Sequence, residues 1–171
     1  MFDVIASEAG AESPLWAEAL RSPGEREAIA VFSHLCKPAF ALSVETIYEG
    51  YLLHYGRPRL FEPVDADTAL LLGDYLYAHG LVHIAQTGNV VAVHDLAELI
   101  SLCAQARAEQ TGEDGAAWAA TAASLGEGGL VAAREALRER RDPLPLERLA
   151  REVAGERAVD RAWAAHRARV G

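Results

Sequence analysis

The chain has 171 residues, a length typical of one domain and sufficient for a single hydrophobic core. Its 16 lysines and arginines stand against 25 aspartates and glutamates, which gives a formal net charge of -9 at pH 7. This acidic balance argues against nucleic acid as a partner, because phosphate binding needs a positive face. No apolar run approaches the roughly 18 residues of a membrane span, and the basic start of a secretory signal is missing. We therefore expect a cytoplasmic protein without a membrane span.

Helix signals dominate the first part of the chain. A Ser-Pro pair at 13–14 provides an N-cap and a first-turn proline before LWAEALR. Residues 22–25 have the form of a capping box before REAIAVFSHL. Because Pro38 interrupts that second pattern, we expect two helices, or one kinked helix, over about residues 24–36 and 38–55.

The middle of the chain predicts the core. The loop RPRLFEPVD leads to a helix cap at Asp65 or Asp67. Helices are then expected over about residues 67–87 and 90–110, separated by a Gly-Asn turn. Together with the helix over 38–55, these two are expected to form the core.

The last third continues in helices. The polar connections QTGEDG and GEGG flank the short apolar helix AAWAATAASL. Residues 142–171 predict two amphipathic helices whose outward arginines form either a solvated or a docking surface. Cys36 and Cys103 lie in apolar helical patterns, which predicts two small buried side chains in a reducing compartment. We interpret residues 1–171 as one all-α, single-domain helix bundle.

Two pairs of polar residues in the expected core could form a site. His79 and His83 are four residues apart and so share one face of their helix, as do Glu45 and Glu49 on the preceding helix. Imidazoles and carboxylates on neighbouring helices suit zinc, iron or manganese. The set lacks the Glu-x-x-His pairs of di-iron bundles, and Gly80 stands where a zinc protease has its glutamate. The alternative is that these side chains bond to one another, or face solvent or a subunit partner.

Other polar residues of the same helices allow two interpretations. Asp74 is expected to be a buried carboxylate that a tyrosine or a backbone amide satisfies. Five tyrosines are candidates for an interface or a tunnel wall, with ordinary core packing as the alternative. They are Tyr48, Tyr51, Tyr55, Tyr75 and Tyr77.

The central helices resemble those of a known family. LLLGDYLYAHGLVHIAQTGNVVAVHDLAELISLCAQARAEQ is similar to trans-isoprenyl (polyprenyl) diphosphate synthases, in which a helix like LAGDYLLARAL is followed by a turn and a helix ending near AEGE. YLLHYGRPRLF keeps a histidine and a Gly-Arg-Pro at about the distance before GDYL where the family has LIHDD and GRPT. KPAF at 37–40 looks like the family's RPAL, and DGAAWAATAASLG is similar to KTAxLFxxAxxLG. The resemblance covers about residues 35–126 and implies an isoprenoid-synthase-like core.

The chain departs from this family at its catalytic positions. Family enzymes hold magnesium and the diphosphate of an allylic substrate with aspartates on facing helices, because clustered carboxylates hold the cations that neutralise the departing diphosphate. Here His54-Tyr55-Gly56 replaces the first aspartate motif, and no Asp-Asp-x-x-Asp occurs. No catalytic residue can be carried over, so we expect no prenyl transfer by the isolated chain and no cofactor.

The resemblance implies a non-catalytic relative, since some enzymes of this family are heteromers in which one subunit lacks the aspartates. The leading hypothesis is an accessory or regulatory subunit that partners an active prenyl diphosphate synthase subunit, with a homo-oligomer as the other assembly. Two alternatives stay open. One is a metal-binding enzyme that uses Glu45, Glu49, His79 and His83, and the other is a module that holds an isoprenoid or other lipid without turnover.

Overall fold

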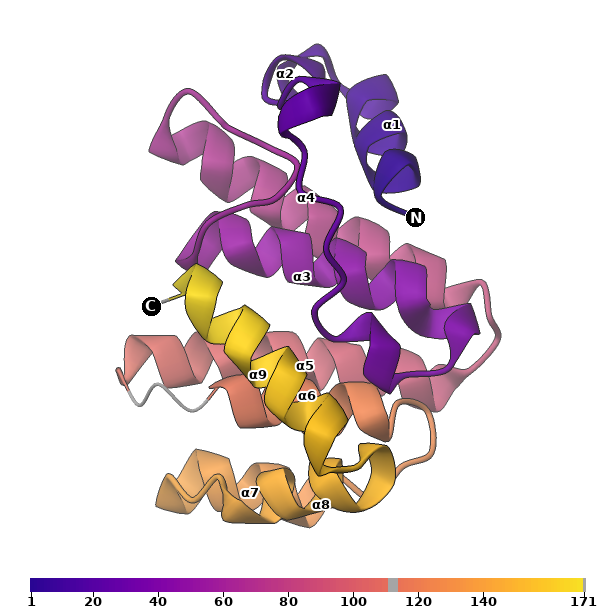
Figure 1. The fold of residues 1–171 in the computed structure, drawn as a ribbon, viewed down its shortest axis with the longest axis vertical. Coiled ribbons are helices and arrows are strands. Elements are labelled where there is room, and N and C mark those ends of the chain that lie inside the picture. The colour runs from indigo at the N-terminus through magenta and orange to yellow at the C-terminus, as the bar shows by residue number, and fades with distance from the viewer. Residues whose placement is uncertain (111–113, 171) are drawn as a thin grey trace.

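The computed structural model describes residues 1–110 and 114–170, in which all the regular elements are helical. In this part of the chain nine α-helices are joined by 3-10 turns and loops (Figure 1). The helices are α1 (Phe2–Glu12), α2 (Pro14–Glu18), α3 (Ala41–Tyr55), α4 (Ala66–Ala85), α5 (Val90–Ala108), α6 (Asp114–Ala123), α7 (Val131–Arg140), α8 (Leu144–Ala154) and α9 (Glu156–Val170). The prediction of an all-α helix bundle is confirmed. Within the described ranges, none of these helices combines the length and apolar composition that a bilayer crossing demands.

Side-chain caps set the starts of the two longest helices. Asp65 accepts a hydrogen bond from the backbone N–H of Thr68 at 2.7 Å, and α4 begins at the following residue. Asn89 accepts one from the N–H of Ala92 at 3.0 Å at the start of α5. Each cap satisfies an N–H that the first turn of a helix leaves unpaired. Both helices agree with their predicted ranges to within two residues.

The helix predicted over residues 24–36 is wrong. The segment holds only two 3-10 turns separated by irregular chain. The backbone N–H groups of Val31, Phe32 and Ser33 all donate to one carboxylate oxygen of Glu45, at 3.0, 3.2 and 2.9 Å. A charged acceptor that satisfies three successive N–H groups competes successfully with the carbonyls of a helix. This long-range contact therefore overrides the local capping signal.

Two helices, α1 and α7, have no counterpart among the predicted elements. In α1, Ile5 and Ala9 are buried at helical spacing. In α7, Arg134 is buried and donates to Asp95 of α5 at 3.0 Å. Their existence depends on partners distant in sequence, which local patterns do not report.

A buried arginine fastens two flanking segments to α3. The side chains of Arg59, Glu45 and Glu49 are 0% exposed. Arg59 donates from Nε to Glu49 at 2.8 Å and from Nη1 to both Glu45 and the carbonyl oxygen of Ile29. The other oxygen of Glu49 accepts from the backbone N–H groups of Arg59 and Leu60, both at 2.7 Å. The segment before α3 and the loop after it are thus tied to the same two carboxylates. We call Arg59, Glu45 and Glu49 together the Arg59 cluster.

The two carboxylates of the Arg59 cluster share one cation, and backbone N–H groups supply the rest of their hydrogen bonds. Burial raises the pKa of Glu45, but Arg59 and the backbone donors outweigh it and bring the pKa below its usual value. Burial likewise lowers the pKa of Arg59, and the two carboxylates more than reverse that effect. The rings of Phe2 and Tyr48 lie 5.1 and 5.0 Å from the guanidinium carbon, which adds cation–π contacts.

Glycines let α3 and α4 approach backbone to backbone. A Cβ added to Gly50 would lie 2.8 Å from the carbonyl oxygen of Gly73, and one added to Gly73 would lie 2.6 Å from His54 Nε2. A Cβ on Gly80 would lie 2.4 Å from Ile47 Cγ1. Distances this short are not tolerated between real side chains, so the two glycines of GDYLYAHG are required by the packing.

The buried apolar side chains form two clusters. The larger lies among α3, α5, α6, α8 and α9 and contains Trp118. The smaller, which we call the second core, lies between the α1–α2 segment and the α3–α4 pair. Its buried members are Ile5, Ala9, Ala19, Leu53, Leu60, Phe61, Leu72 and Leu76. In Figure 1, α1 and α2 lie at one end of the molecule, and α7 and α8 lie at the other.

A buried polar network holds α9, which crosses the bundle in Figure 1. His166 Nδ1 lies 3.0 Å from the hydroxyl of Tyr48, and its Nε2 lies 3.4 Å from Asp114. Tyr51 donates to Asp114 and accepts a hydrogen bond from Arg107 at 2.6 Å. Burial raises the pKa of Asp114, but the bonds from His166 and Tyr51 and the charge of Arg107 outweigh it and lower the pKa to about 2.

The variant Arg59→Met removes the one buried cation that pairs with the carboxylates of Glu45 and Glu49. We expect the free energy of unfolding to fall by about 3–5 kcal/mol, because unpaired charge stays in the core. Urea unfolding followed by circular dichroism measures this loss. The matched control is Arg157→Met on the exposed surface of α9, for which a change within about 0.5 kcal/mol is expected. Equal stability of the two variants would show that the cluster does not support the fold.

Asp114 also gives the stability a pH dependence. Its pKa lies below the ordinary 3.8, at about 2 in the fold, so its ionised form stabilises the protein above about pH 4, and this contribution is lost as the pH falls toward about 2. The contribution amounts to roughly 2 kcal/mol. We expect Asp114→Asn to flatten the pH dependence of the unfolding free energy in this window, whereas Asp160→Asn, on the exposed face of α9, should not. A slope that Asp114→Asn leaves intact would contradict the network.

Candidate metal centre

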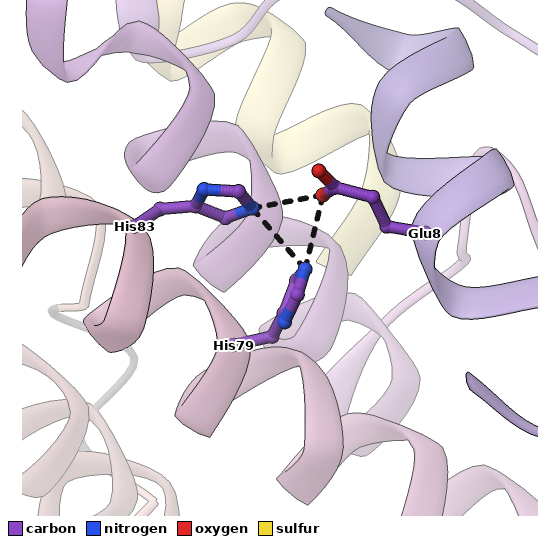
Figure 2. Close-up of side chains that lie close together, drawn as sticks. All are labelled: Glu8, His79 and His83. Atoms are coloured by element: carbon purple, nitrogen blue, oxygen red, sulfur yellow. Dashed lines mark hydrogen bonds and ion pairs between the residues drawn. The ribbon is translucent and has the colours of Figure 1, made fainter. Parts of the chain in front are cut away.

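Three metal-ligating side chains from two helices converge beside α1. Glu8 comes from α1, and His79 and His83 come from α4 (Figure 2). One carboxylate oxygen, Glu8 Oε2, lies 3.0 Å from His79 Nε2 and 2.8 Å from His83 Nε2. The two Nε2 atoms lie 3.1 Å apart. Within residues 1–110 and 114–170, this is the one group of three or more such ligand atoms that lie close together.

The positions of these residues follow from the helices that carry them. His79 and His83 project from one face of α4 because they are one helical turn apart. Ile5 and Ala9 of α1 are buried in the second core, and Glu8 between them lies at its edge. Burial of α1 therefore brings the carboxylate over the two imidazoles.

Two protonation states are compatible with this arrangement. If both Nε2 atoms carry protons, Glu8 Oε2 accepts from both, as one oxygen of Glu49 accepts from two backbone N–H groups. If both Nε2 atoms are bare, their lone pairs and those of Glu8 Oε2 converge, and a cation can be coordinated between them. Metal–ligand bonds of about 2.0–2.2 Å hold ligand atoms roughly 3.3–3.6 Å apart in a tetrahedron, so the observed 2.8–3.1 Å would have to widen by a few tenths of an ångström to admit the ion.

The site is half-buried and its carboxylate is ionised. The exposed fractions of the side chains are 24% for His79, 14% for His83 and 36% for Glu8. Partial burial raises the pKa of Glu8, but the hydrogen bonds and charges of the two histidines outweigh it, so the pKa lies below its usual value. A charged ligand is thus present at neutral pH, and one side of the site stays open to solvent.

Aromatic contacts hold the imidazole rings in place. The ring of His79 stacks on Tyr75, with centroids 5.2 Å apart, and meets His83 edge to face at 4.5 Å. Tyr75 in turn stacks on Trp16 of α2 at 6.0 Å. Residues that orient the ligands of a metal site limit the reorganisation needed for binding.

The predicted set of four ligands is not assembled. His79 and His83 lie together as expected, but Glu45 and Glu49 are fully buried and engaged by Arg59. The third ligand is Glu8, which no sequence argument selected. The signal that could have found it is the spacing of Phe2, Ile5 and Ala9, which is that of an amphipathic helix needing an apolar partner.

The five predicted tyrosines divide into two groups. Tyr48 and Tyr51 are fully buried and bonded within the network of Asp114, so they are core residues and not surface or interface residues of this chain. Tyr55, Tyr75 and Tyr77 are only partly buried. Tyr55 borders an open hollow of about 610 Å³ between the ends of α3 and α9.

Two further expectations about single residues have different outcomes. Asp74 is not buried, since 65% of its side chain is exposed, and its carboxylate lies 3.2 Å from Nε2 of the partly buried His54. It faces outward because α4 turns the opposite side toward the second core. Cys103 is buried and Cys36 partly so, and burial raises the pKa of the Cys36 thiol to about 12. The prediction of two buried side chains is thus confirmed for Cys103, whereas Cys36 is only partly buried.

Comparison of the chain with protein-family models, with curated protein sequences and with solved structures found no match.

Proposed function

We propose that the protein binds one divalent transition metal ion through Glu8, His79 and His83. The observation that carries this proposal is the convergence of two imidazole nitrogens and one carboxylate oxygen to within 2.8–3.1 Å of one another. Two imidazoles and a carboxylate are a ligand set that suits zinc and iron(II), and calcium and magnesium favour oxygen ligands instead.

Three protein ligands leave a coordination position for water or for a ligand from outside. Structural zinc sites are usually closed by four protein ligands, whereas sites with three keep an exchangeable position. The solvent-exposed side of the cluster is where this position falls, given the exposed fractions of Glu8 and His79. Such a site supports reversible binding, so the proposed function is that of a protein that responds to metal.

Titration with zinc in a calorimeter tests the proposal. We expect one ion per chain for the wild type and a loss of affinity of about 100-fold or more, or roughly 2.7 kcal/mol, for Glu8→Gln, His79→Ala or His83→Ala. Each of these variants leaves two ligands, fewer than zinc sites use. Cobalt absorption spectra report the coordination geometry in the same samples.

Two control variants match these in chemistry and differ in place. Glu12→Gln changes an exposed carboxylate on the same helix, and His94→Ala removes an exposed histidine of α5. Both should bind zinc like the wild type. Zinc binding that Glu8→Gln and Glu12→Gln weaken equally would refute the assignment of the ligands.

A non-catalytic subunit of a heteromeric prenyl diphosphate synthase is a second candidate. Two observations favour it. The two carboxylates that α3 turns inward are already engaged by Arg59, which leaves neither free for magnesium. On the outer sides of α4 and α5, Leu71, Val82 and Val91 are 56%, 54% and 45% exposed, as in a surface that a partner covers.

The test of this second candidate is an assay with allylic and isopentenyl diphosphates and magnesium. We expect no product from the isolated chain, because the segment that resembles the family lacks the clustered carboxylates that could hold the cations. Added to an active synthase, the chain should change the product length, and Leu71→Glu with Val82→Glu should abolish that effect. Turnover by the isolated chain would refute this candidate, as would an active synthase that never responds.

A further inference from the structure

The N-terminal helices form a separate cover on the α3–α4 pair. We call residues 2–19, which include α1 and α2, the N-terminal hairpin. Its buried Ile5, Ala9 and Ala19 pack on apolar side chains of α3, α4 and the loop between them, and not on the main core. Its connection to the rest of the chain is secured by two backbone hydrogen bonds, from Arg21 N to Leu60 O at 2.9 Å and from Glu62 N to Ala19 O at 2.7 Å.

Helix α1 is fixed at two points outside this apolar contact. Near its start, the ring of Phe2 lies over the guanidinium of Arg59 at 5.1 Å. Near its end, Glu8 meets His79 and His83. With only 11 residues, α1 is too short to stay helical by itself, since isolated helices shorter than about 12–15 residues are marginal in water. Its folding therefore depends on staying docked.

The ligands of the metal site come from both sides of this contact. The two histidines belong to α4, and the carboxylate belongs to the hairpin. An ion thus meets three ligands when α1 is docked and two when it is not, which makes its affinity for the docked state higher. Any ligand with such a difference in affinity shifts the equilibrium toward the state that it prefers.

We infer that an ion bound by Glu8, His79 and His83 acts as a latch that holds the N-terminal hairpin over the second core. This inference rests on the metal site proposed above. With the ion bound, the hairpin continues to cover Leu72 and Leu76 of α4, and Phe2 continues to shield Arg59 from solvent. Without it, the hairpin opens more often, and the apolar surface of α3 and α4 becomes accessible. Metal supply thereby sets how often that surface is exposed.

Hydrogen exchange measured by mass spectrometry, with and without zinc, tests the latch on the full chain. At a free zinc concentration one hundred times the dissociation constant of the docked state, opening of α1 should be suppressed about 50-fold, because the open state keeps two ligands and binds about 100-fold more weakly. We therefore expect the amides of residues 2–12 to exchange about 50-fold more slowly, and those of α9 to be unchanged. Glu8→Gln should remove the effect of zinc, and Glu12→Gln should retain it.

The outcomes separate the latch from the site itself. If calorimetry shows that zinc binds but residues 2–12 exchange at an unchanged rate, the latch is refuted and the proposed metal site stands. If zinc does not bind at all, both are refuted. If zinc slows exchange equally throughout the chain, the ion stabilises the whole fold, and a local latch is again refuted. The comparison of the wild type with and without zinc does not depend on whether any variant folds.

Discussion

One guanidinium between two carboxylates organises this molecule. Arg59 has no exposed atom, so every donor it carries must find an acceptor inside the protein, and the positions of Glu45 and Glu49 on α3 decide where those acceptors are. The same carboxylates collect the backbone N–H groups of the segment before α3 and of the loop after it. Apolar side chains in place of these three residues would avoid the free-energy cost of desolvating the charges. They could not, however, specify the paths of two loops at once.

The candidate metal centre depends on this cluster through a short series of contacts. Arg59 fixes the loop that carries Leu60 and Phe61, and these side chains form part of the seat for the N-terminal hairpin. Phe2 then packs on the guanidinium itself. The docking of α1 places Glu8 above the histidines of α4. A buried ion cluster thus positions the half-exposed group of Glu8, His79 and His83, and the two groups share no residue.

The sequence predicted those features that nearby residues determine. The helices α4 and α5 follow from the cap expected at Asp65 or Asp67 and from the Gly-Asn turn before residue 90, and the shared face of His79 and His83 follows from their spacing alone. Features set by distant partners were missed. The sequence before residue 26 has the form of a capping box, but the Ser22 side chain caps no backbone N–H, and the carboxylate of Glu45 takes N–H groups that a helix would use. Glu8 is 71 residues from His79, and no local pattern connects them.

The prediction of a four-residue site failed for a related reason. The spacing of residues on a helical wheel shows which side chains share a face of the helix. It does not show which other segment of the chain packs on that face. Glu45 and Glu49 share a face as predicted, but that face meets Arg59, a residue in a segment that the sequence marks only as a loop. Buried carboxylates need a counter-charge, and here Arg59 supplies it.

The bare contact between α3 and α4 restricts how the molecule can deform. Where Gly50 faces Gly73 and Gly80 faces Ile47, the two helices pack in close contact, without room for a Cβ at these glycines. Sliding one past the other by a turn would drive bulky side chains into backbone. The pair therefore resists sliding, whereas the N-terminal hairpin is joined to it through side chains of the second core and the contacts of Phe2 and Glu8.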